Sequence, residues 1–132
     1  MNLKIMKFKN VNSTNDIAIK LIQKGKLFSG LVVSKKQKKG RGTMGKKWIS
    51  IKGNLFVSFF YDLENLGLSL PKLTKFNFLL VKKLISIYYK KKIYYKKPND
   101  LLIQKKKISG ILQEIIKKFN KRYLIVGIGI NL

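Results

Sequence analysis

A glycine-rich stretch flanked by cations, Gly40-Arg41-Gly42-Thr43-Met44-Gly45, is the part of this chain best suited to bind an anion. Three glycines in six residues let the backbone adopt positive φ and approach a ligand closely. Backbone amides in such a loop can point at the oxygens of a polyphosphate or a carboxylate. The stretch is therefore either an anion cradle or a solvated surface loop, and the surrounding residues must decide.

The spacing of these glycines also matches G-x-G-x-x-G, a dinucleotide-binding pattern that requires a strand before the loop and a helix after it. Residues 31–34 satisfy the first requirement. Residues 47–61 do not satisfy the second, because they are rich in β-branched and aromatic residues and contain Gly53. The sequence therefore disfavours a dinucleotide-binding fold.

The composition limits the chemistry that this chain can perform. Its 132 residues fit one domain with a substantial core. It contains neither cysteine nor histidine, which excludes a disulfide framework, a thiolate metal site and an imidazole base. Any reaction must therefore rely on lysine, arginine, carboxylates, amides and backbone groups. Residues 1–10 are too charged for a signal peptide and no apolar run could span a membrane, so we expect a cytoplasmic protein without membrane association.

The net charge of +25 allows two explanations. A strongly basic surface is typical of nucleic-acid-binding proteins. However, only Arg41 and Arg122 among the 30 basic residues are arginines, the residues that bind phosphates and bases bidentately. An A+T-rich genome also favours the codons of Lys, Ile, Asn, Tyr and Phe, so these residues accumulate at surface positions that are not constrained. We favour this second explanation and expect weak, non-specific affinity for polyanions but no specific nucleic-acid partner.

The hydropathy pattern predicts an α+β fold with a mixed, mostly antiparallel sheet and helices packed on it. Strands are expected at residues 3–8, 30–34, 48–50, 54–61, 93–96, 101–104, 107–117 and 124–132. Residues 48–50 and 54–61 are expected to pair through a turn at Lys52-Gly53, and 54–61 should be a central strand.

Two helices are expected between these strands. The first begins at the capping residues Ser13-Thr14-Asn15 and stops at Gly25. The second begins at Pro71 and ends at Lys90-Lys91-Lys92. Its buried stripe is predicted to consist of Leu73, Phe76, Leu80, Leu84 and Ile87.

Five short stretches resemble, in order and spacing, the catalytic core of biotin–protein ligases. They are Ser13-Thr14-Asn15; Gln37-x-x-Gly40-Arg41-Gly42-x-x-Gly45 with Trp48; Gly53-Asn54-Leu55; Lys96-x-Pro98-Asn99-Asp100; and residues 107–112, Lys-Ile-Ser-Gly-Ile-Leu, closed by residues 127–131, Gly-Ile-Gly-Ile-Asn. The resemblance covers nearly the whole chain. It implies the biotin/lipoate-ligase catalytic-domain fold, which is similar to class II synthetases.

The same resemblance implies a two-step reaction that uses biotin, ATP and Mg²⁺. The biotin carboxylate attacks the α-phosphate of ATP to give biotinyl-5′-adenylate, and a lysine of a biotin carboxyl carrier protein, usually that of acetyl-CoA carboxylase, then takes the biotin. Neither step needs a protein nucleophile, histidine or cysteine. Lysine, arginine, Mg²⁺ and backbone amides can bring the two anions together and stabilise the negative charge.

By this resemblance, each matching residue receives an expected role. Lys96 and Arg41 would be catalytic, Lys96 by stabilising the transition state and Arg41 as part of a loop that closes over the ligands. Biotin would be bound by Ser13, Thr14, Asn15, Gln37, Arg41, Gly42, Thr43, Lys96 and Gly110. ATP would be bound by Gly40, Gly45, Trp48, Asn54, Asn99, Asp100 and Asn131, with Asp100 as the candidate metal ligand. Ser13–Asn15 could serve simply as a helix cap, Lys96 as a solvated lysine and Asp100 as a turn residue.

Three departures from the family pattern are expected to matter. Thr43 stands where the family often has arginine, a cation that would help hold the adenylate. Lys97 stands where the family usually has tryptophan, and loss of that ring is expected to loosen the site. The chain stops at Leu132, so residues 1–132 are expected to form a single catalytic domain without the family's C-terminal portion or an N-terminal DNA-binding domain. A homodimer is left open.

Other functions compete with an active ligase. The chain could be a weak or inactive remnant of a ligase, or a basic nucleic-acid-binding domain, although the latter leaves the five stretches unexplained. Lipoate–protein ligase is the nearest enzymatic alternative, because it shares the fold and the adenylate chemistry. The Gly-Arg-Gly loop and the Lys-x-Pro-Asn-Asp stretch favour biotin.

Overall fold

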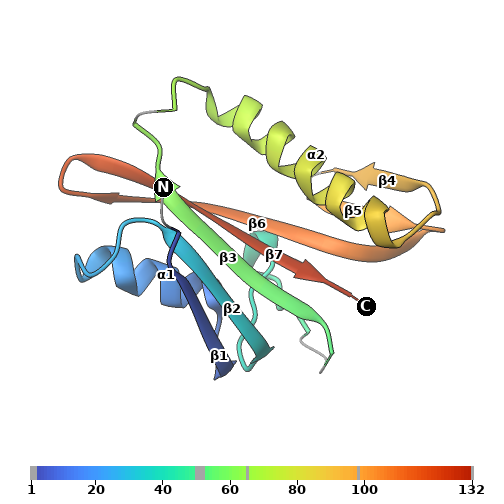
Figure 1. Cartoon of the computed structure of the whole chain (residues 1–132), viewed down its shortest axis with the longest axis horizontal. Coiled ribbons are helices and arrows are strands. Elements are labelled where there is room, and N and C mark those ends of the chain that lie inside the picture. Colours follow the sequence, from blue (N-terminus) through green and yellow to red (C-terminus); the bar gives the residue numbers. More distant parts are fainter. Residues whose placement is uncertain (1–2, 50–52, 65, 98, 132) are drawn as a thin grey trace.

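The computed structural model describes residues 3–49, 53–64, 66–97 and 99–131. Within them, one seven-stranded sheet runs in the order β1-β2-β3-β7-β6-β5-β4 (Figure 1). The strands are β1 (Ile5–Val11), β2 (Gly30–Gln37), β3 (Leu55–Asp62), β4 (Ile93–Lys96), β5 (Asp100–Ile103), β6 (Lys106–Lys118) and β7 (Lys121–Ile130). β1 and β2 pair in parallel and every other neighbouring pair is antiparallel, which confirms the predicted mixed α+β fold.

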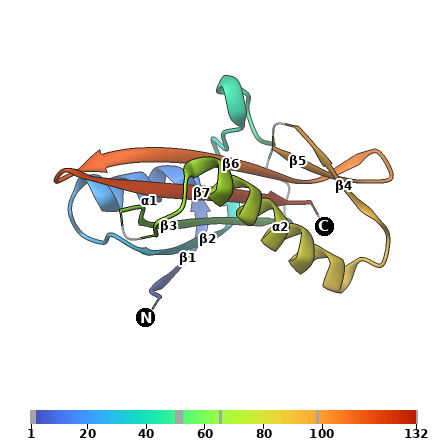
Figure 2. The ribbon, with the colours of Figure 1, turned by 90° about the horizontal axis from the view of Figure 1, so that it is seen from above.

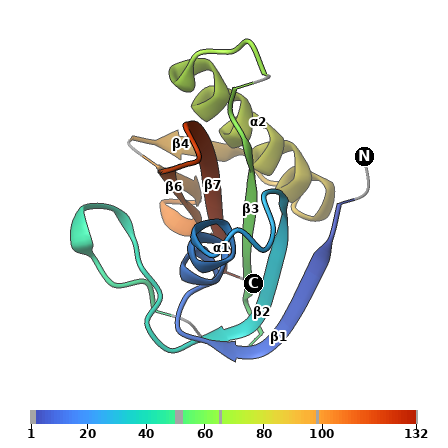
Figure 3. The same cartoon turned by 90° about the vertical axis from the view of Figure 1, so that its left-hand side faces the viewer.

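The two helices cover opposite faces of this sheet (Figure 3). Helix α1 (Thr14–Gln23) crosses between the parallel strands β1 and β2, and helix α2 (Leu70–Tyr88) connects β3 to β4. Alternation along β7 shows the two faces clearly: Leu124 and Val126 belong to the core under α2, whereas Tyr123 and Ile125 belong to the core under α1. β3 and β7 are therefore central strands, as predicted for residues 54–61.

Helix α1 begins and ends as the sequence predicts. Ser13 is its N-cap, and the Ser13 hydroxyl accepts a hydrogen bond of 3.3 Å from the backbone N–H of Asp16. Gly25 follows the helix with φ of +65°, a conformation that glycine adopts without steric cost. Neither α1 nor α2 is long and apolar enough to cross a bilayer.

The predicted buried stripe of α2 is wrong except for Leu73. The side chains that pack on the sheet are Leu73, Phe78, Val81 and Ile85, whereas Phe76, Leu80, Leu84 and Ile87 are each about half exposed. The helix carries two apolar stripes, and helical periodicity alone cannot tell which of them faces the sheet. Pro71 lies in the first turn as predicted, but the helix ends at Tyr88, before Lys90-Lys91-Lys92.

The strand expected at residues 48–50 does not form at Trp48 and Ile49, which lie outside regular secondary structure. Both edges of β3 pair with β2 and β7, so no position beside it remains for a further strand. Ser50, Lys52 and Leu132 lie outside the described residues. Other strands differ only at their ends; β2 continues to Gln37 and β7 begins at Lys121.

The glycine-rich loop follows β2 and projects from the face opposite α2 (Figure 2). Its tip is a 3₁₀ turn, Thr43–Gly45, in which Met44 has φ of 56°. No α-helix directly follows the loop, because β3 is the next regular element in the described residues. The dinucleotide-binding pattern therefore lacks its helix, as the sequence indicated.

Candidate active site

A pocket of about 290 Å³ opens on the α1 face of the sheet, where the N-terminus of α1, the glycine-rich loop and strands β6 and β7 meet. Most of the predicted site residues line it. They are Ser13, Thr14, Asn15, Gln37, Arg41, Gly42, Thr43, Trp48, Lys96, Asn99, Asp100 and Gly110. Segments that are far apart in the sequence thus contribute to one site.

Glycines of two neighbouring strands form the floor of this pocket. Gly110 of β6 and Gly129 of β7 are directly paired, and the indole of Trp48 covers both. A Cβ atom on Gly110 would lie 2.5 Å from the Trp48 ring, and one on Gly129 would lie 2.6 Å from it. Only glycine therefore fits beneath this ring. The Trp48 Nε1 donor is buried against Gly129 and has no hydrogen-bond partner among the described residues.

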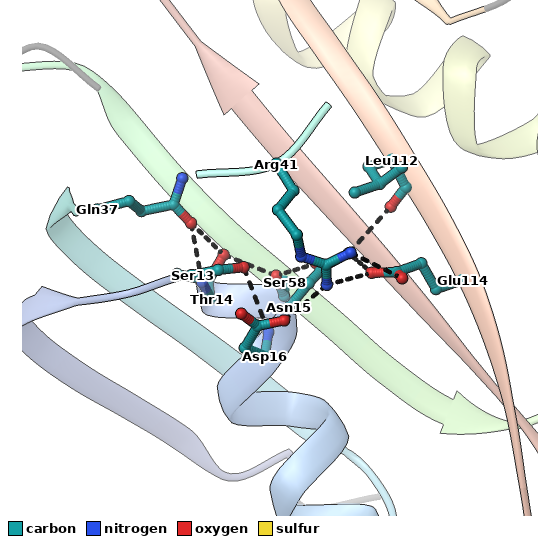
Figure 4. Close-up of polar contacts among 9 residues, drawn as sticks. All are labelled: Ser13, Thr14, Asn15, Asp16, Gln37, Arg41, Ser58, Leu112 and Glu114. Atoms are coloured by element: carbon teal, nitrogen blue, oxygen red, sulfur yellow. Dashed lines mark hydrogen bonds and ion pairs between the residues drawn. The ribbon is translucent and has the colours of Figure 1, made fainter. Parts of the chain in front are cut away.

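One wall consists of polar side chains at the start of α1 (Figure 4). The backbone N–H and the hydroxyl of Thr14 both donate to Gln37 Oε1, at 2.8 and 3.1 Å. Ser58 Oγ, on β3, lies 2.7 Å from Thr14 Oγ1 and 2.5 Å from Asn15 Oδ1 and can donate its one proton to either. Thr14, Asn15 and Ser58 are all buried, so their hydrogen bonds hold the wall rigidly. Such a wall suits an uncharged polar ligand group.

Arg41 points from the loop to two carboxylates beside this wall. Its guanidinium bonds bidentately to Glu114, at 2.7 and 3.0 Å, and also lies 2.7 Å from Asp16 Oδ1. The hydrogen bonds that Arg41 donates to Glu114 raise the pKa of Arg41. Burial raises the pKa of Glu114, but hydrogen bonds from Arg41 and Asn15 outweigh it, so this pKa lies below its ordinary value.

Lys107 forms a cationic end of the pocket that the sequence reasoning missed. Its Nζ lies 2.9 Å from Asp100 Oδ1 and 4.5 Å from the centre of the Trp48 ring. Lys96 and Lys97 line the same end, and Lys96 is exposed and directly opposite Asp100 in the β4–β5 pair. Several ammonium groups thus gather where a polyphosphate could lie.

Asn54 and Asn131, predicted to bind ATP, do not line the pocket. Instead, Asn54 Nδ2 donates to Asn131 Oδ1 at 3.1 Å, and Asn131 Nδ2 donates to the backbone carbonyl of Lys107 at 3.1 Å. The two amides therefore fix the start of β6, which carries Lys107. Asn99 lines the pocket but bonds through both its side chain and its backbone to Ile111. Pro98 lies outside the described residues.

Gly40 and Gly45 do not line the pocket either. Gly40 is buried at the base of the loop, where a Cβ atom would lie 2.8 Å from Gln37 Nε2 and from the Trp48 carbonyl oxygen. It therefore lets the two ends of the loop close on each other. Gly45 has φ of +72° at the exposed tip, which a residue with a side chain would rarely adopt.

Comparison with known proteins agrees with this arrangement. The family model described as the biotin/lipoate A/B protein ligase family matches residues 7–131. The chain belongs to this family.

The relatives include a bifunctional ligase/repressor and several biotin protein ligases. The chain is 33% identical over 125 residues to the bifunctional ligase/repressor BirA of Escherichia coli K12, covering 92% of this chain and 38% of BirA. The biotin protein ligase of Aquifex aeolicus in complex with biotin and ATP is 33% identical, with a TM-score of 0.79, over 98% of this chain and 52% of that one. The Leishmania major enzyme in complex with biotinyl-5-AMP is 29% identical, with a TM-score of 0.81, over 100% and 58%. The chain thus spans between about a third and three-fifths of these relatives.

Asp100 is the one carboxylate among the described residues that line the pocket. The described residues contain no group of three or more His, Cys, Asp or Glu side chains that could hold a metal ion. Asp100 lines the pocket and is ion-paired with Lys107. Mg²⁺ is commonly bound by one or two carboxylates together with substrate phosphates. The pocket therefore fits Mg²⁺ that arrives with a nucleotide, not a cation held by protein alone.

Proposed function

We propose that this chain joins biotin to ATP as biotinyl-5′-adenylate and then passes the biotin to a lysine of a carrier protein, in the cytoplasm. Family membership supports adenylate chemistry of this type. The relatives whose structures contain biotin with ATP, or biotinyl-5-AMP, match 98–100% of the chain. The activity is a proposal for this chain, because it spans only part of each of those proteins.

One observation carries the proposal: a neutral hydrogen-bonding wall and a cationic end share one pocket across a glycine floor. The wall of Thr14, Asn15 and Gln37 suits the ureido ring of biotin, which both donates and accepts hydrogen bonds. The cationic end, with Lys96 and Lys107, suits the biotin carboxylate and the α-phosphate. The Trp48 ring lies on the glycine floor, so a ligand in this pocket would meet the indole there.

The chemistry then follows from placing two anions side by side. An oxygen of the biotin carboxylate forms a bond to the α-phosphorus of ATP, the bond from that phosphorus to the bridging oxygen breaks, and pyrophosphate leaves. Lys96 and Lys107 offset the negative charge that otherwise keeps the reactants apart. The amine of the acceptor lysine then attacks the biotinyl carbonyl carbon, and AMP leaves. Mg²⁺ bound to the phosphates, with Asp100 as its protein ligand, would supply further charge neutralisation.

We further propose that the acceptor is the biotin carboxyl carrier domain of acetyl-CoA carboxylase. The pocket rim offers Lys46, Lys47 and Lys97, which attract acidic surfaces. With a net charge of +25, the chain favours an acidic partner over a basic one.

The direct test is transfer of biotin to a purified carrier domain in the presence of ATP and Mg²⁺. The wild-type chain should transfer biotin, and Lys96→Ala and Lys107→Ala should each lower the initial rate by about 100-fold or more, because each removes a cation near the developing charge. Arg41→Ala should also slow transfer. Lys82→Ala on α2, on the opposite face of the sheet, should match the wild type. A folded wild type that transfers nothing, or active-site variants that equal the wild type, would refute the proposal.

A further inference from the structure

Two of the five carboxylates in this chain converge on the guanidinium of Arg41. Glu114 binds it bidentately, and Asp16 binds the same Nη2 at 2.7 Å. Bidentate, charge-assisted hydrogen bonds of this kind fix both distance and orientation. In a chain of net charge +25, two carboxylates on one arginine are a strong local concentration of negative charge.

Glu114 also joins this cluster to the polar wall of the pocket. Its Oε1 accepts a hydrogen bond of 3.0 Å from Asn15 Nδ2, while Asn15 Oδ1 contacts Ser58. Asn15 is buried, and its side chain occupies the space that a Cβ on Gly127 would need. Glu114 therefore connects the loop to the wall, as Figure 4 shows.

The loop has few other polar attachments. The backbone N–H groups of Lys38 and Lys39 bond to the carbonyls of Val11 and Asn12, at the base of the loop. Within the described residues, the backbone hydrogen bonds of residues 40–49 all run inside the loop, namely Gly42 to Lys46, Lys46 to Thr43 and Trp48 to Gly40. The Arg41 cluster is therefore the polar link that crosses from the loop to α1 and β6.

We propose that Glu114 is a positioning residue that, together with Asp16, holds Arg41 and its loop closed over the pocket. This inference rests on the proposed function, because it assigns the closed loop to retention of the biotinyl adenylate. Because protein carboxylates already bind the guanidinium of Arg41, neutralising the negative charge of the ligand is left to the lysines of the pocket. Opening of the loop should then release the adenylate sooner without slowing its reaction with the acceptor lysine.

Limited trypsin digestion tests whether these contacts hold the loop closed in the ligand-free protein. Trypsin can cut this loop after Lys38, Lys39, Arg41, Lys46 and Lys47, and cleavage after its four lysines, which every variant keeps, can be measured relative to cleavage at Lys90–Lys92. Glu114→Gln should raise this ratio by about tenfold, because it removes a bidentate charged pair. Arg41→Gln should raise it at least as much, because it also removes the bond to Asp16, and Glu114→Gln should add nothing further in the Arg41→Gln background.

Two further variants complete this digestion experiment. Asp16→Asn should raise the ratio by a smaller factor, since Asp16 makes one bond to Arg41 where Glu114 makes two. Glu64→Gln, which removes an ion pair with Arg122 outside the pocket, should leave the ratio unchanged. An unchanged ratio in Glu114→Gln, or additive effects of Glu114→Gln and Arg41→Gln, would overturn the proposal.

Dissociation of biotinyl-5′-adenylate, followed through Trp48 emission, tests the consequence for the ligand. Glu114→Gln should speed release by about tenfold, while transfer from pre-bound adenylate to the carrier domain proceeds at the wild-type rate. Equal losses in retention and in transfer would show a role in the chemistry itself and would overturn the positioning role. If the wild type does not bind the adenylate, the proposed function fails, and the digestion result still decides whether Glu114 holds the loop.

Discussion

Trp48 is the one tryptophan of the chain, so its fluorescence reports on the pocket alone. Its ring rests on the paired glycines Gly110 and Gly129. A methyl group on Gly129 cannot share this space, because its Cβ would lie 2.6 Å from a ring carbon.

Gly129→Ala should therefore displace the indole, shift its emission to longer wavelength and weaken biotin binding by about tenfold or more. Ile130→Val is the matched control, because Ile130 belongs to the same strand, packs in the core under α2 and does not line the pocket. That variant should cost about 0.5–1.5 kcal/mol of stability and leave the emission maximum in place. Unchanged emission in Gly129→Ala would show that the ring does not lie on the glycine floor.

Glu114 makes the stability of the protein depend on pH in a definite direction. Burial alone would raise its pKa above the ordinary 4.5, but the hydrogen bonds from Arg41 and Asn15 hold it lower. A carboxyl group whose pKa is lower in the folded state stabilises that state above its ordinary pKa, and this contribution is lost as the pH falls through the lowered value.

The difference in unfolding free energy between the wild type and Glu114→Gln should accordingly be largest near about pH 7 and should narrow below about pH 4.5. Denaturant titrations at several pH values measure it. The groups that face Glu114 are Arg41, Asp16 and Asn15, and Asp16 can be removed in the background as Asp16→Asn. A difference that stays constant or grows in acid would contradict the charged pair.

At the scale of elements, helix α2 has two apolar stripes, of which one packs on the sheet and the other is about half exposed. Ile85 is 3% exposed against the sheet, whereas its neighbour Leu84 is 49% exposed. Ile85→Ala should cost about 2–5 kcal/mol, because it empties a packed site. Leu84→Ala should change stability by only about 0.5 kcal/mol in either direction. Denaturant unfolding of the two variants decides between the stripes; equal costs would mean that both faces are packed in solution.

The sequence correctly predicted the features that depend only on neighbouring residues. The cap at Ser13, the stop at Gly25 and the proline at the start of α2 all lie where short-range rules placed them. The stripe of α2 that packs and the absent strand at Trp48–Ile49 depend on contacts with distant strands, which no local pattern contains.

The site residues also divide into those that a contiguous motif identifies and those that only the fold brings together. The loop and the Lys96–Asp100 stretch are contiguous motifs, so their residues could be found from sequence, although their catalytic and binding roles stay predictions. Ser58, Lys107 and Glu114 were missed, because each becomes part of the site only when its strand lies beside another. Glu114 could have been found from the sequence. It lies four residues after Gly110 on β6, and because side chains alternate between the two faces of a strand, the two residues face the same side of the sheet.

At the scale of the whole molecule, the few carboxylates of this basic chain are placed where they have partners. All five pair with a cation, and three of them, Asp16, Asp100 and Glu114, do so at or beside the pocket. The excess positive charge is spread along the chain and both arginines are ion-paired, which agrees better with an unconstrained lysine-rich surface than with a nucleic-acid interface.

The central claim is that this pocket, in this chain, activates biotin as its adenylate. Formation of biotinyl-5′-adenylate in a single turnover, with protein in excess over biotin and with ATP labelled at the α-phosphate, tests it without any carrier protein. We predict labelled biotinyl-5′-adenylate bound to the wild-type chain, and about 100-fold slower formation in Lys107→Ala. A folded wild-type chain that forms no labelled adenylate at saturating biotin, ATP and Mg²⁺ would contradict the account.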